Sequence, residues 1–365
     1  MTPAIGSRRS EPHRDAGSRL PGLDVLRGLC ALAVVFFHFT TRFQMIWGHP
    51  SSPPFLVPWG QRGVEVFFVV SGFAIELSLA SHPTPRDFVE ARAVRLFPTF
   101  WAALAVTFAV VSVFGLPDRG ISGKDALLNL TMIAGTLGVP AADAVYWTLE
   151  RELRFYALVL VLLAFGRREL TVHALFATVA LEALGTRFAI PHALRDLAND
   201  GFSHLFAAGA VLARTRRGSP RWTALGVVPC LLGARLLGST QFVWATVAVA
   251  LVWLATRPMG DRAFRPLVFL GRISYPLYLV HQYVGYVAMR ALYARDASPV
   301  TAIAVASALG VSVATVLHFT VERPSLELVR RRRRGSPNPA PGRARATVDR
   351  EAARPARRAG SDGAT

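Results

Sequence analysis

Long apolar blocks separated by short polar segments dominate the chain. The first block, residues 25–46, is long enough to span a bilayer as a helix. The block at 199–213 is short, and an apolar stretch at 126–139 does not reach spanning length, so either is compatible with a re-entrant segment. The pattern predicts an all-α fold, a polytopic integral membrane helical bundle with about ten transmembrane helices. The blocks after the first lie near residues 63–80, 94–116, 145–165, 170–190, 199–213, 222–238, 241–256, 273–293 and 299–320.

Arginine placement supports an even number of spans. Arginines cluster in alternate connections, whereas the connections between them hold few. Because cytoplasmic loops carry the excess of positive charge, both termini are predicted to be cytoplasmic. The clusters contain Arg8, Arg9, Arg14 and Arg19, then Arg86, Arg92 and Arg95, then Arg167 and Arg168, then Arg214, Arg216, Arg217 and Arg221, then Arg257, Arg262, Arg265 and Arg272, and finally Arg330 to Arg334.

Composition agrees with a membrane protein. Hydrophobic residues make up 52% of the 365 residues, and the formal net charge is +18. The arginines do not follow one amphipathic face, so nucleic acid is not expected as a partner. Cys30 and Cys230, the two cysteines, lie inside apolar blocks and indicate no disulfide framework.

The two ends differ from the middle of the chain. Residues 1–22 are polar and basic and lack the pattern of a secretory signal, so the first block is expected to be an uncleaved anchor. We expect disordered cytoplasmic tails at 1–22 and 329–365, with a membrane domain at 23–328 between them. Arginines of the C-terminal tail would favour anionic lipid.

The first block carries two ionisable residues, Arg27 and His38, eleven positions apart. Eleven steps rotate a helix by about 1100° and advance it by about 16 Å, so both side chains share one face at different depths. A charge in hydrocarbon costs at least about 2.5 kcal/mol, and such residues therefore face a bundle interior, a cavity or a partner. We expect the functional site in that cavity.

The surroundings of these two residues suggest their roles. Asp24 lies three residues before Arg27, close enough to pair with it. His38 is the natural proton acceptor, because imidazole titrates near neutrality. The alternative is a helix-packing histidine, with Arg27 extending to the headgroups. Spacing alone leaves both open.

The second block contains FFVVSGFAIEL, with Ser71 and Gly72 at its middle. A Ser-Gly pair permits close helix approach or a local kink. No base is placed beside Ser71 by sequence, so packing is favoured over a nucleophilic role.

Two arginines precede the third block in FVEARAVRLFP. Arg92 and Arg95 stand three residues apart, on one face of a helix at its cytoplasmic mouth. Such a pair of guanidinium groups is well suited to bind phosphate oxygens by bidentate hydrogen bonds. The alternative is an ordinary pair of positive charges in a cytoplasmic loop.

The fourth block opens with YWTLERELRFY, which holds Trp147, Glu150 and Glu152. The two glutamates point about 200° apart on a helix, so at most one faces a given cavity. The predicted topology puts this cluster at the external membrane surface. There a carboxylate could orient His38 or bind an acceptor hydroxyl, or the cluster forms an interfacial belt of aromatic and charged residues.

The ninth block carries GRISYPLYLVHQY, in which Ser274, Tyr278 and His281 line roughly one face. His281 is either a second catalytic or binding group or a structural hydrogen-bond donor. After the tenth block, Glu322 and Arg323 are interpreted as an ion pair at a helix end. No metal site is expected, and four intramembrane residues match no spacing that we can interpret: Glu182, His204, Arg235 and Arg290.

Six strings carry a family resemblance by their order: LDVLRGLCALAVVFFHF, FFVVSGFAI, EARAVRLFP, YWTLERELRFY, ISYPLYLVHQ and VERP. Together they closely resemble the membrane-bound acyltransferase-3 family, which acylates carbohydrates and other extracytoplasmic or membrane-proximal acceptors. The match covers about residues 20–328. The resemblance implies an O-acyltransferase of the bacterial inner membrane, with no tightly bound cofactor and with acyl-CoA, most simply acetyl-CoA, as co-substrate.

The resemblance also implies residue roles. Arg27 and His38 fit the family's catalytic arginine-histidine motif, and Arg92 with Arg95 fits its acyl-donor arginine pair. Glu152 fits the glutamate of a Trp-Ser-Leu-x-x-Glu signature as a catalytic residue, although Thr148 replaces the usual serine. Ser71, Trp147, Tyr278 and His281 fall on family elements and are expected to contact substrate.

These roles combine into an expected mechanism. His38 would deprotonate an acceptor hydroxyl, directly or through an acyl intermediate, while Arg27 and Asp24 fix geometry and charge. The expected acceptor is a cell-surface or lipid-linked carbohydrate. Alternatives are a macrolide-type acceptor, or a transporter or flippase, although the sequence shows no inverted repeat with paired broken helices. The oligomeric state is left open.

Overall fold

The computed structural model describes residues 20–335, except 83, 198, 217–219 and 259–264. All regular structure in this part of the chain is helical, as predicted. The α-helices are α1 Pro21–Phe36, α2 Phe43–Ile46, α3 Gly63–Ser78, α4 Pro85–Phe114, α5 Gly123–Asn129, α6 Trp147–Ala164, α7 Thr171–Gly185, α8 His192–Leu197, α9 Ser203–Thr215, α10 Pro220–Leu237, α11 Ser239–Ala255, α12 Arg265–Arg272, α13 Ser274–Tyr293, α14 Pro299–Leu317 and α15 Arg323–Gly335. Short 3₁₀ segments are η2 Pro58–Arg62, η3 Ala144–Tyr146, η4 Arg168–Leu170 and η5 Asn199–Gly201, and π-helical segments are η1 Phe37–Arg42 and η6 His318–Glu322.

A helix occurs within each predicted apolar block, but ten full spans are not confirmed. Among the described residues, three helices are long and apolar enough to cross a membrane: Pro21–Ile46, Pro85–Phe114 and Pro299–Val329. The others are too short, too polar or too rich in charged residues to meet the requirements for a span. For example, α9 has 13 residues and α3 has 16.

The predicted boundaries need small corrections at both ends. The first helix begins at Pro21, and α15 extends to Gly335, so residues 21–22 and 329–335 are helical although they were expected to belong to disordered tails. Apart from Leu20, the rest of both predicted tails lies outside the described residues.

Helix α4 begins nine residues before the block that predicts it. Thr84 caps it by accepting a hydrogen bond from the Asp87 backbone N–H, and Pro85 occupies the first turn, where no donor is needed. As a result Arg92 and Arg95 lie within a 30-residue helix rather than in a loop.

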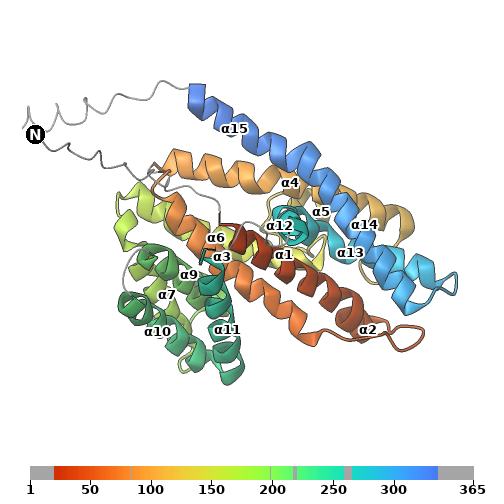
Figure 1. Cartoon of the computed structure of the whole chain (residues 1–365), viewed down its shortest axis with the longest axis horizontal. Coiled ribbons are helices and arrows are strands. Elements are labelled where there is room, and N and C mark those ends of the chain that lie inside the picture. The colour runs from red at the N-terminus through yellow and green to blue at the C-terminus, as the bar shows by residue number, and fades with distance from the viewer. Residues whose placement is uncertain (1–19, 83, 198, 217–219, 259–264, 336–365) are drawn as a thin grey trace, which may run out of the picture.

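Helix α1 is the central element of the bundle (Figure 1), with α7, α9, α10 and α11 gathered on one side and α4, α13, α14 and α15 on the other. Leu26 and Val34 of α1 belong to a core cluster that includes residues of α3, α6 and α9. Ala31 and Val35 belong to a second cluster that includes residues of α13 and α14. Because both sides of α1 are covered by protein, its ionisable residues face the bundle and not lipid.

Helices α3 and α9 approach closely at two glycines. A Cβ atom added to Gly72 would lie 2.1 Å from the Phe206 backbone oxygen, and one added to Gly209 would lie 2.0 Å from the Val69 backbone oxygen. Only glycine fits such contacts. The close approach expected at the Ser-Gly pair is confirmed.

Two long helices contain π-helical turns, which are rare and often occur at functional sites. The first, η1, continues α1 and holds His38; Thr40 within it donates to the Phe36 carbonyl oxygen. The second, η6, joins α14 to α15 and holds His318 and Glu322. Each therefore changes the direction of the side chains along its helix just where ionisable groups occur.

Candidate active site

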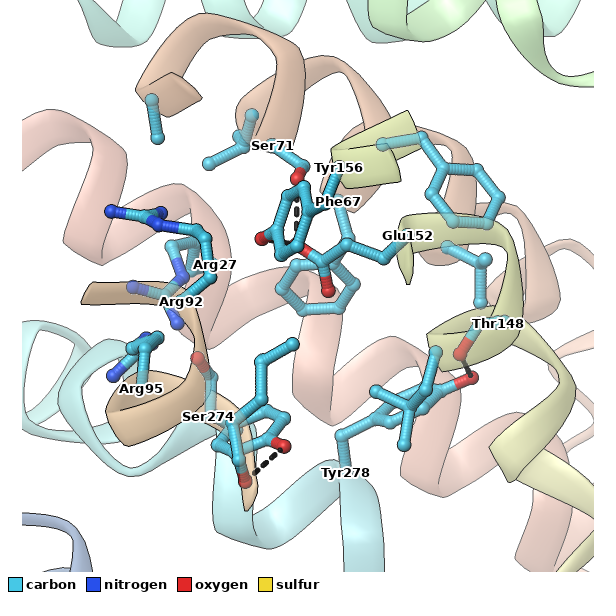
Figure 2. A pocket seen from close by; sticks show the side chains of 17 residues that line it. Arg27, Phe67, Ser71, Arg92, Arg95, Thr148, Glu152, Tyr156, Ser274 and Tyr278 are labelled. Carbon is cyan, nitrogen blue, oxygen red and sulfur yellow. Dashed lines mark hydrogen bonds between the residues drawn. The ribbon is translucent and has the colours of Figure 1, made fainter. Parts of the chain in front are cut away.

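A cavity of about 170 Å³ lies between α1, α3, α4, α6 and α13. Figure 2 shows three arginines gathered along one side of it, with Thr148 and Tyr278 across from them. Small-molecule pockets typically measure about 300–1,000 Å³, so this cavity suits the end of a long ligand rather than a whole nucleotide. We call it the arginine cavity; its polar lining includes Arg27, Ser71, Arg92, Arg95, Glu152 and Tyr278.

Arg95 is held in the arginine cavity by a buried carboxylate. Its guanidinium donates to Glu322, and the other Glu322 oxygen lies 2.7 Å from Nδ1 of His318. The Arg95 guanidinium also lies 5.4 Å from the ring centroid of Tyr275. The expected ion pair between Glu322 and its neighbour Arg323 is wrong, because Arg323 instead donates to Glu327 at 2.8 Å.

The guanidinium groups of the other two arginines in the cavity are not paired with a carboxylate of the described residues. Among the described residues, Arg27 and Arg92 form no hydrogen bond or ion pair, and the Arg92 guanidinium lies 5.8 Å from the ring centroid of Tyr156. The expected pairing of Asp24 with Arg27 is not found there as an ion pair. Asp24 is buried, and its backbone oxygen packs against Gly271 of α12. Two guanidinium groups therefore lie ready for an anion.

Glu152 lines the arginine cavity and not the histidine cavity, so it does not orient His38, which was one of the roles considered for a carboxylate of this cluster. Its Oε1 accepts a hydrogen bond from Ser71 Oγ at 2.6 Å and another from the Tyr156 hydroxyl. Glu150 points elsewhere, as its angular separation predicts, and accepts from Arg154 at 2.6 Å. Trp147 is the first residue of α6, and Glu152 follows it by five residues. Glu152 therefore lies about 7.5 Å further along the helix axis than Trp147.

A second, larger cavity of about 420 Å³ adjoins the first. We call it the histidine cavity, because His38 from the π-helical turn lines it. Its size falls within the usual range for small-molecule sites. The rest of its polar lining includes Arg42, Gln61, Arg62, Glu65, Gln241 and Gln282, with Trp147 as an aromatic wall.

A second imidazole positions His38. His281 is fully buried, and its Nδ1 lies 2.9 Å from the Tyr278 carbonyl oxygen and 3.1 Å from that of Leu277. That nitrogen therefore carries the proton in a neutral ring, and Nε2 of His281 is an acceptor. His38 Nδ1 lies 2.9 Å from this acceptor and 3.0 Å from the Val34 carbonyl oxygen. Both partners accept, so Nδ1 of His38 is protonated and its Nε2 keeps a lone pair.

The two cavities meet at Val64 and Tyr278, which line both. The Tyr278 hydroxyl is 2.9 Å from Thr148 Oγ1, which can donate to it, and 3.1 Å from the Val145 carbonyl oxygen. Thr148 replaces a serine of the expected signature and supplies the same hydroxyl here. The expected single cavity shared by Arg27 and His38 is therefore two cavities with a thin common wall.

The structure thus brings most predicted site residues into one connected region. Arg27, Ser71, Arg92, Arg95 and Glu152 line the arginine cavity, His38 and Trp147 line the histidine cavity, Tyr278 borders both, and His281 lies behind His38. Sequence reasoning missed Glu65 and Gln282. Their signal was present, since both are polar residues inside apolar blocks.

Four intramembrane residues matched no spacing that we could interpret from the sequence, and the structure shows contacts for three of them. Oε1 of Glu182 accepts backbone hydrogen bonds from Gly201 at 3.1 Å and Ser203 at 2.9 Å, which caps the start of α9. Arg290 lies over the ring of Trp47, 5.5 Å from its centroid. His204 Nδ1 lies 4.0 Å from the second oxygen of Glu182. Nothing in the structure explains Arg235.

Comparison with known proteins decides the family. A family profile described as an acyltransferase domain, that of acyltransferase-3, matches residues 20–319. The chain belongs to the acyltransferase-3 family. The match spans α1 through α14, so both cavities lie inside the family domain and the enzyme is an acyltransferase.

Curated relatives agree with this membership. The chain is 30% identical to the membrane-bound transacylase BcsY of Komagataeibacter xylinus, over 72% of each chain. It is 28% identical to the exopolysaccharide production protein ExoZ of Rhizobium meliloti, over 75% of this chain and 92% of that one. It is also 28% identical to the acyltransferase MdmB of Streptomyces mycarofaciens, over 86% and 94%. No solved structure matches the chain. With its long apolar helices, this acyltransferase is an integral membrane protein.

Proposed function

We propose that this acyltransferase moves an acyl group, most simply acetyl, from cytoplasmic acyl-CoA to a hydroxyl of a cell-surface or lipid-linked carbohydrate. The observation that carries the proposal is the pair of cavities that meet at Tyr278. One cavity is basic, and the other contains an imidazole with a free lone pair. A donor and an acceptor that enter from opposite sides would meet at this wall.

The arginine cavity supports the donor half of the proposal. Arg27 and Arg92 form no hydrogen bond or ion pair with the described residues, and Arg95 is fixed by Glu322. Guanidinium groups bind phosphate oxygens in a bidentate manner. The CoA phosphates would lie at Arg92 and Arg95, and the narrow cavity beyond them would take the pantetheine end with its thioester directed at Tyr278.

The histidine cavity supports the acceptor half. His38 Nε2 takes the proton of the acceptor hydroxyl as the oxygen attacks the thioester carbonyl carbon. The carbon–sulfur bond then breaks, and the thiolate of CoA leaves and takes up that proton. The Val34 carbonyl oxygen and His281 both accept from Nδ1 of His38, which holds the ring in the tautomer that can act as the base, and His281 also orients the ring. The products are an ester on the acceptor and free CoA.

The direction of the reaction follows from arginine placement. We propose a bacterial plasma-membrane protein with both termini in the cytoplasm, because arginines cluster in alternate connections. In that orientation the arginine cavity opens toward the side where acyl-CoA is made. The name of ExoZ, an exopolysaccharide production protein, supports a carbohydrate acceptor on the other side.

Acetyl-CoA turnover by the purified protein in nanodiscs tests this function. Release of the CoA thiol by the wild type, and its loss in His38→Ala with unchanged acetyl-CoA affinity, is the expected result. An Arg92→Ala/Arg95→Ala double variant should lose acetyl-CoA affinity. Full activity of His38→Ala, or unchanged affinity of the double variant, contradicts the proposed roles.

A further inference from the structure

Two residues that line the histidine cavity each carry a buried oxygen atom with no hydrogen-bond partner among the described residues. These atoms are Oε1 of Gln282 and Oε2 of Glu65, on side chains whose residues are 3% and 7% exposed. The rest of each side chain is already engaged. The Gln282 amide nitrogen donates to the Tyr286 hydroxyl at 3.3 Å, and the other Glu65 oxygen accepts from Arg62 at 2.6 Å. Each oxygen therefore needs a donor that the described residues do not provide.

The residues that line the histidine cavity restrict which chemical group can donate hydrogen bonds to these two oxygens. An acyl chain supplies no donor, so it would leave both oxygens unpaired. An ionised carboxylate or phosphodiester likewise offers these oxygens no donor, and a cation would meet the guanidinium groups of Arg42 and Arg62. A neutral group with several hydroxyls satisfies both oxygens without a net charge.

The rest of the lining fits a sugar ring. Trp147 is 42% exposed and packs against Phe202, with ring centroids 5.4 Å apart. It therefore presents an amphipathic aromatic surface that is able to cover the apolar face of a pyranose. Gln61 and Gln241 add amide groups to the same cavity, and such groups both donate to and accept from hydroxyls.

Both residues also line the same cavity as the proposed base, His38. Gln282 follows His281, whose Nε2 contacts His38, and Glu65 follows Val64, which lines both cavities. A ring bound to Gln282 and Glu65 would therefore present a further hydroxyl beside His38.

We propose that Gln282 and Glu65 bind hydroxyls of a neutral pyranose acceptor through these two oxygens, with Trp147 packing against the ring. This inference rests on the proposed function and adds the residues that select its acceptor. Both residues act on the acceptor alone. Neither contributes to binding of the acyl donor, because neither lines the arginine cavity.

The test uses a deletion strain of the host that is complemented with the full chain carrying Gln282→Met or Glu65→Gln. Both substitutions keep side-chain volume and change the oxygen acceptor. Acyl ester is measured on extracted cell-surface carbohydrate by hydroxylamine release. The affinity of each purified protein for acetyl-CoA is measured by calorimetry. Gln44→Leu is the matched control, because Gln44 is exposed and lies outside both cavities.

We expect each variant to lower carbohydrate acyl ester by about tenfold, the effect of about one lost hydrogen bond to a buried group, with acetyl-CoA affinity unchanged. Wild-type ester content in both variants overturns the inference, as does a parallel loss of acetyl-CoA affinity in folded protein. Acyl ester found on a small lipophilic metabolite and not on carbohydrate overturns the acceptor class. If the wild-type protein binds no acetyl-CoA and restores no ester, the proposed function itself is contradicted. This result differs from a loss of ester in the variants alone, which concerns only the acceptor residues.

Discussion

Replacement of His281 tests whether one imidazole positions the other. In His281→Phe an aromatic ring is kept, but the Nε2 acceptor that lies 2.9 Å from His38 Nδ1 is lost. The Val34 carbonyl oxygen, 3.0 Å from the same nitrogen, still holds the proton on Nδ1. His38 should therefore keep its tautomer and lose only part of its orientation.

The structure gives the size of the effect. One intramolecular hydrogen bond contributes about 0.5–1.5 kcal/mol, which corresponds to a fall in kcat of about 2- to 13-fold. Loss of a general base costs about 10²- to 10⁴-fold, which is the expectation for His38→Ala. His281→Gln, whose side-chain oxygen is able to accept near the Nε2 position, should recover part of the rate.

The assay is acetyl-CoA turnover by purified protein in nanodiscs, with water as acceptor and release of the CoA thiol as the signal. KM for acetyl-CoA should not change in His281→Phe or His281→Gln, because His281 lines neither cavity. Turnover equal to wild type in His281→Phe would refute the positioning role. A loss as large as that of His38→Ala, with no recovery in His281→Gln, would refute it as well.

Three further predictions follow from the packing and the arginine cavity. Arg92→Ala should raise KM for acetyl-CoA by about 10-fold or more, because a charge-assisted hydrogen bond contributes about 1.5–3 kcal/mol. Glu322→Gln should raise the same KM with little change in kcat, because Arg95 loses the carboxylate that fixes it. Gly72→Ala should lower the thermal unfolding temperature, because its Cβ would lie 2.1 Å from a backbone oxygen of α9, and such overpacking costs about 1–3 kcal/mol.

Each of these predictions has its own control. Gly120→Ala should leave the unfolding temperature unchanged, since nothing lies within 4 Å of an added Cβ atom there. Equal unfolding temperatures for Gly72→Ala and Gly120→Ala would contradict the close contact of α3 with α9. An exposed charge outside both cavities, as in Arg295→Ala, should not affect KM. A change in kcat alone in Glu322→Gln would show that the buried carboxylate acts in the chemistry.

Hydrophobic patterning predicted the helices well because each helix buries or exposes an apolar face at a regular period. Block length predicted spans less well. Helix α9, for example, is apolar but has 13 residues, and its glycine packs on α3, so tertiary contact and not bilayer length explains its composition. A single sequence cannot distinguish these two causes of an apolar block.

The site shows the same limit. The spacing of Arg27 and His38 predicted that both side chains face a cavity within the bundle, and in the structure each of them lines one. It did not predict two cavities, because the division depends on Tyr278, which arrives from α13 and bonds to Thr148 of α6. Likewise the neighbours of Glu322 in sequence suggested a local ion pair, whereas its partner Arg95 is distant in sequence. A contact between two segments that are distant in sequence leaves no recognisable pattern in the residues around either partner.

The central claim is that donor and acceptor meet at the wall between the arginine and histidine cavities. A cryo-electron microscopy map of the protein with a non-hydrolysable thioether analogue of acetyl-CoA tests it most directly. The account predicts phosphate density against Arg92 and Arg95, with the sulfur beside Tyr278 and facing His38. Analogue density that enters through the histidine cavity, or that lies outside both cavities, would contradict it.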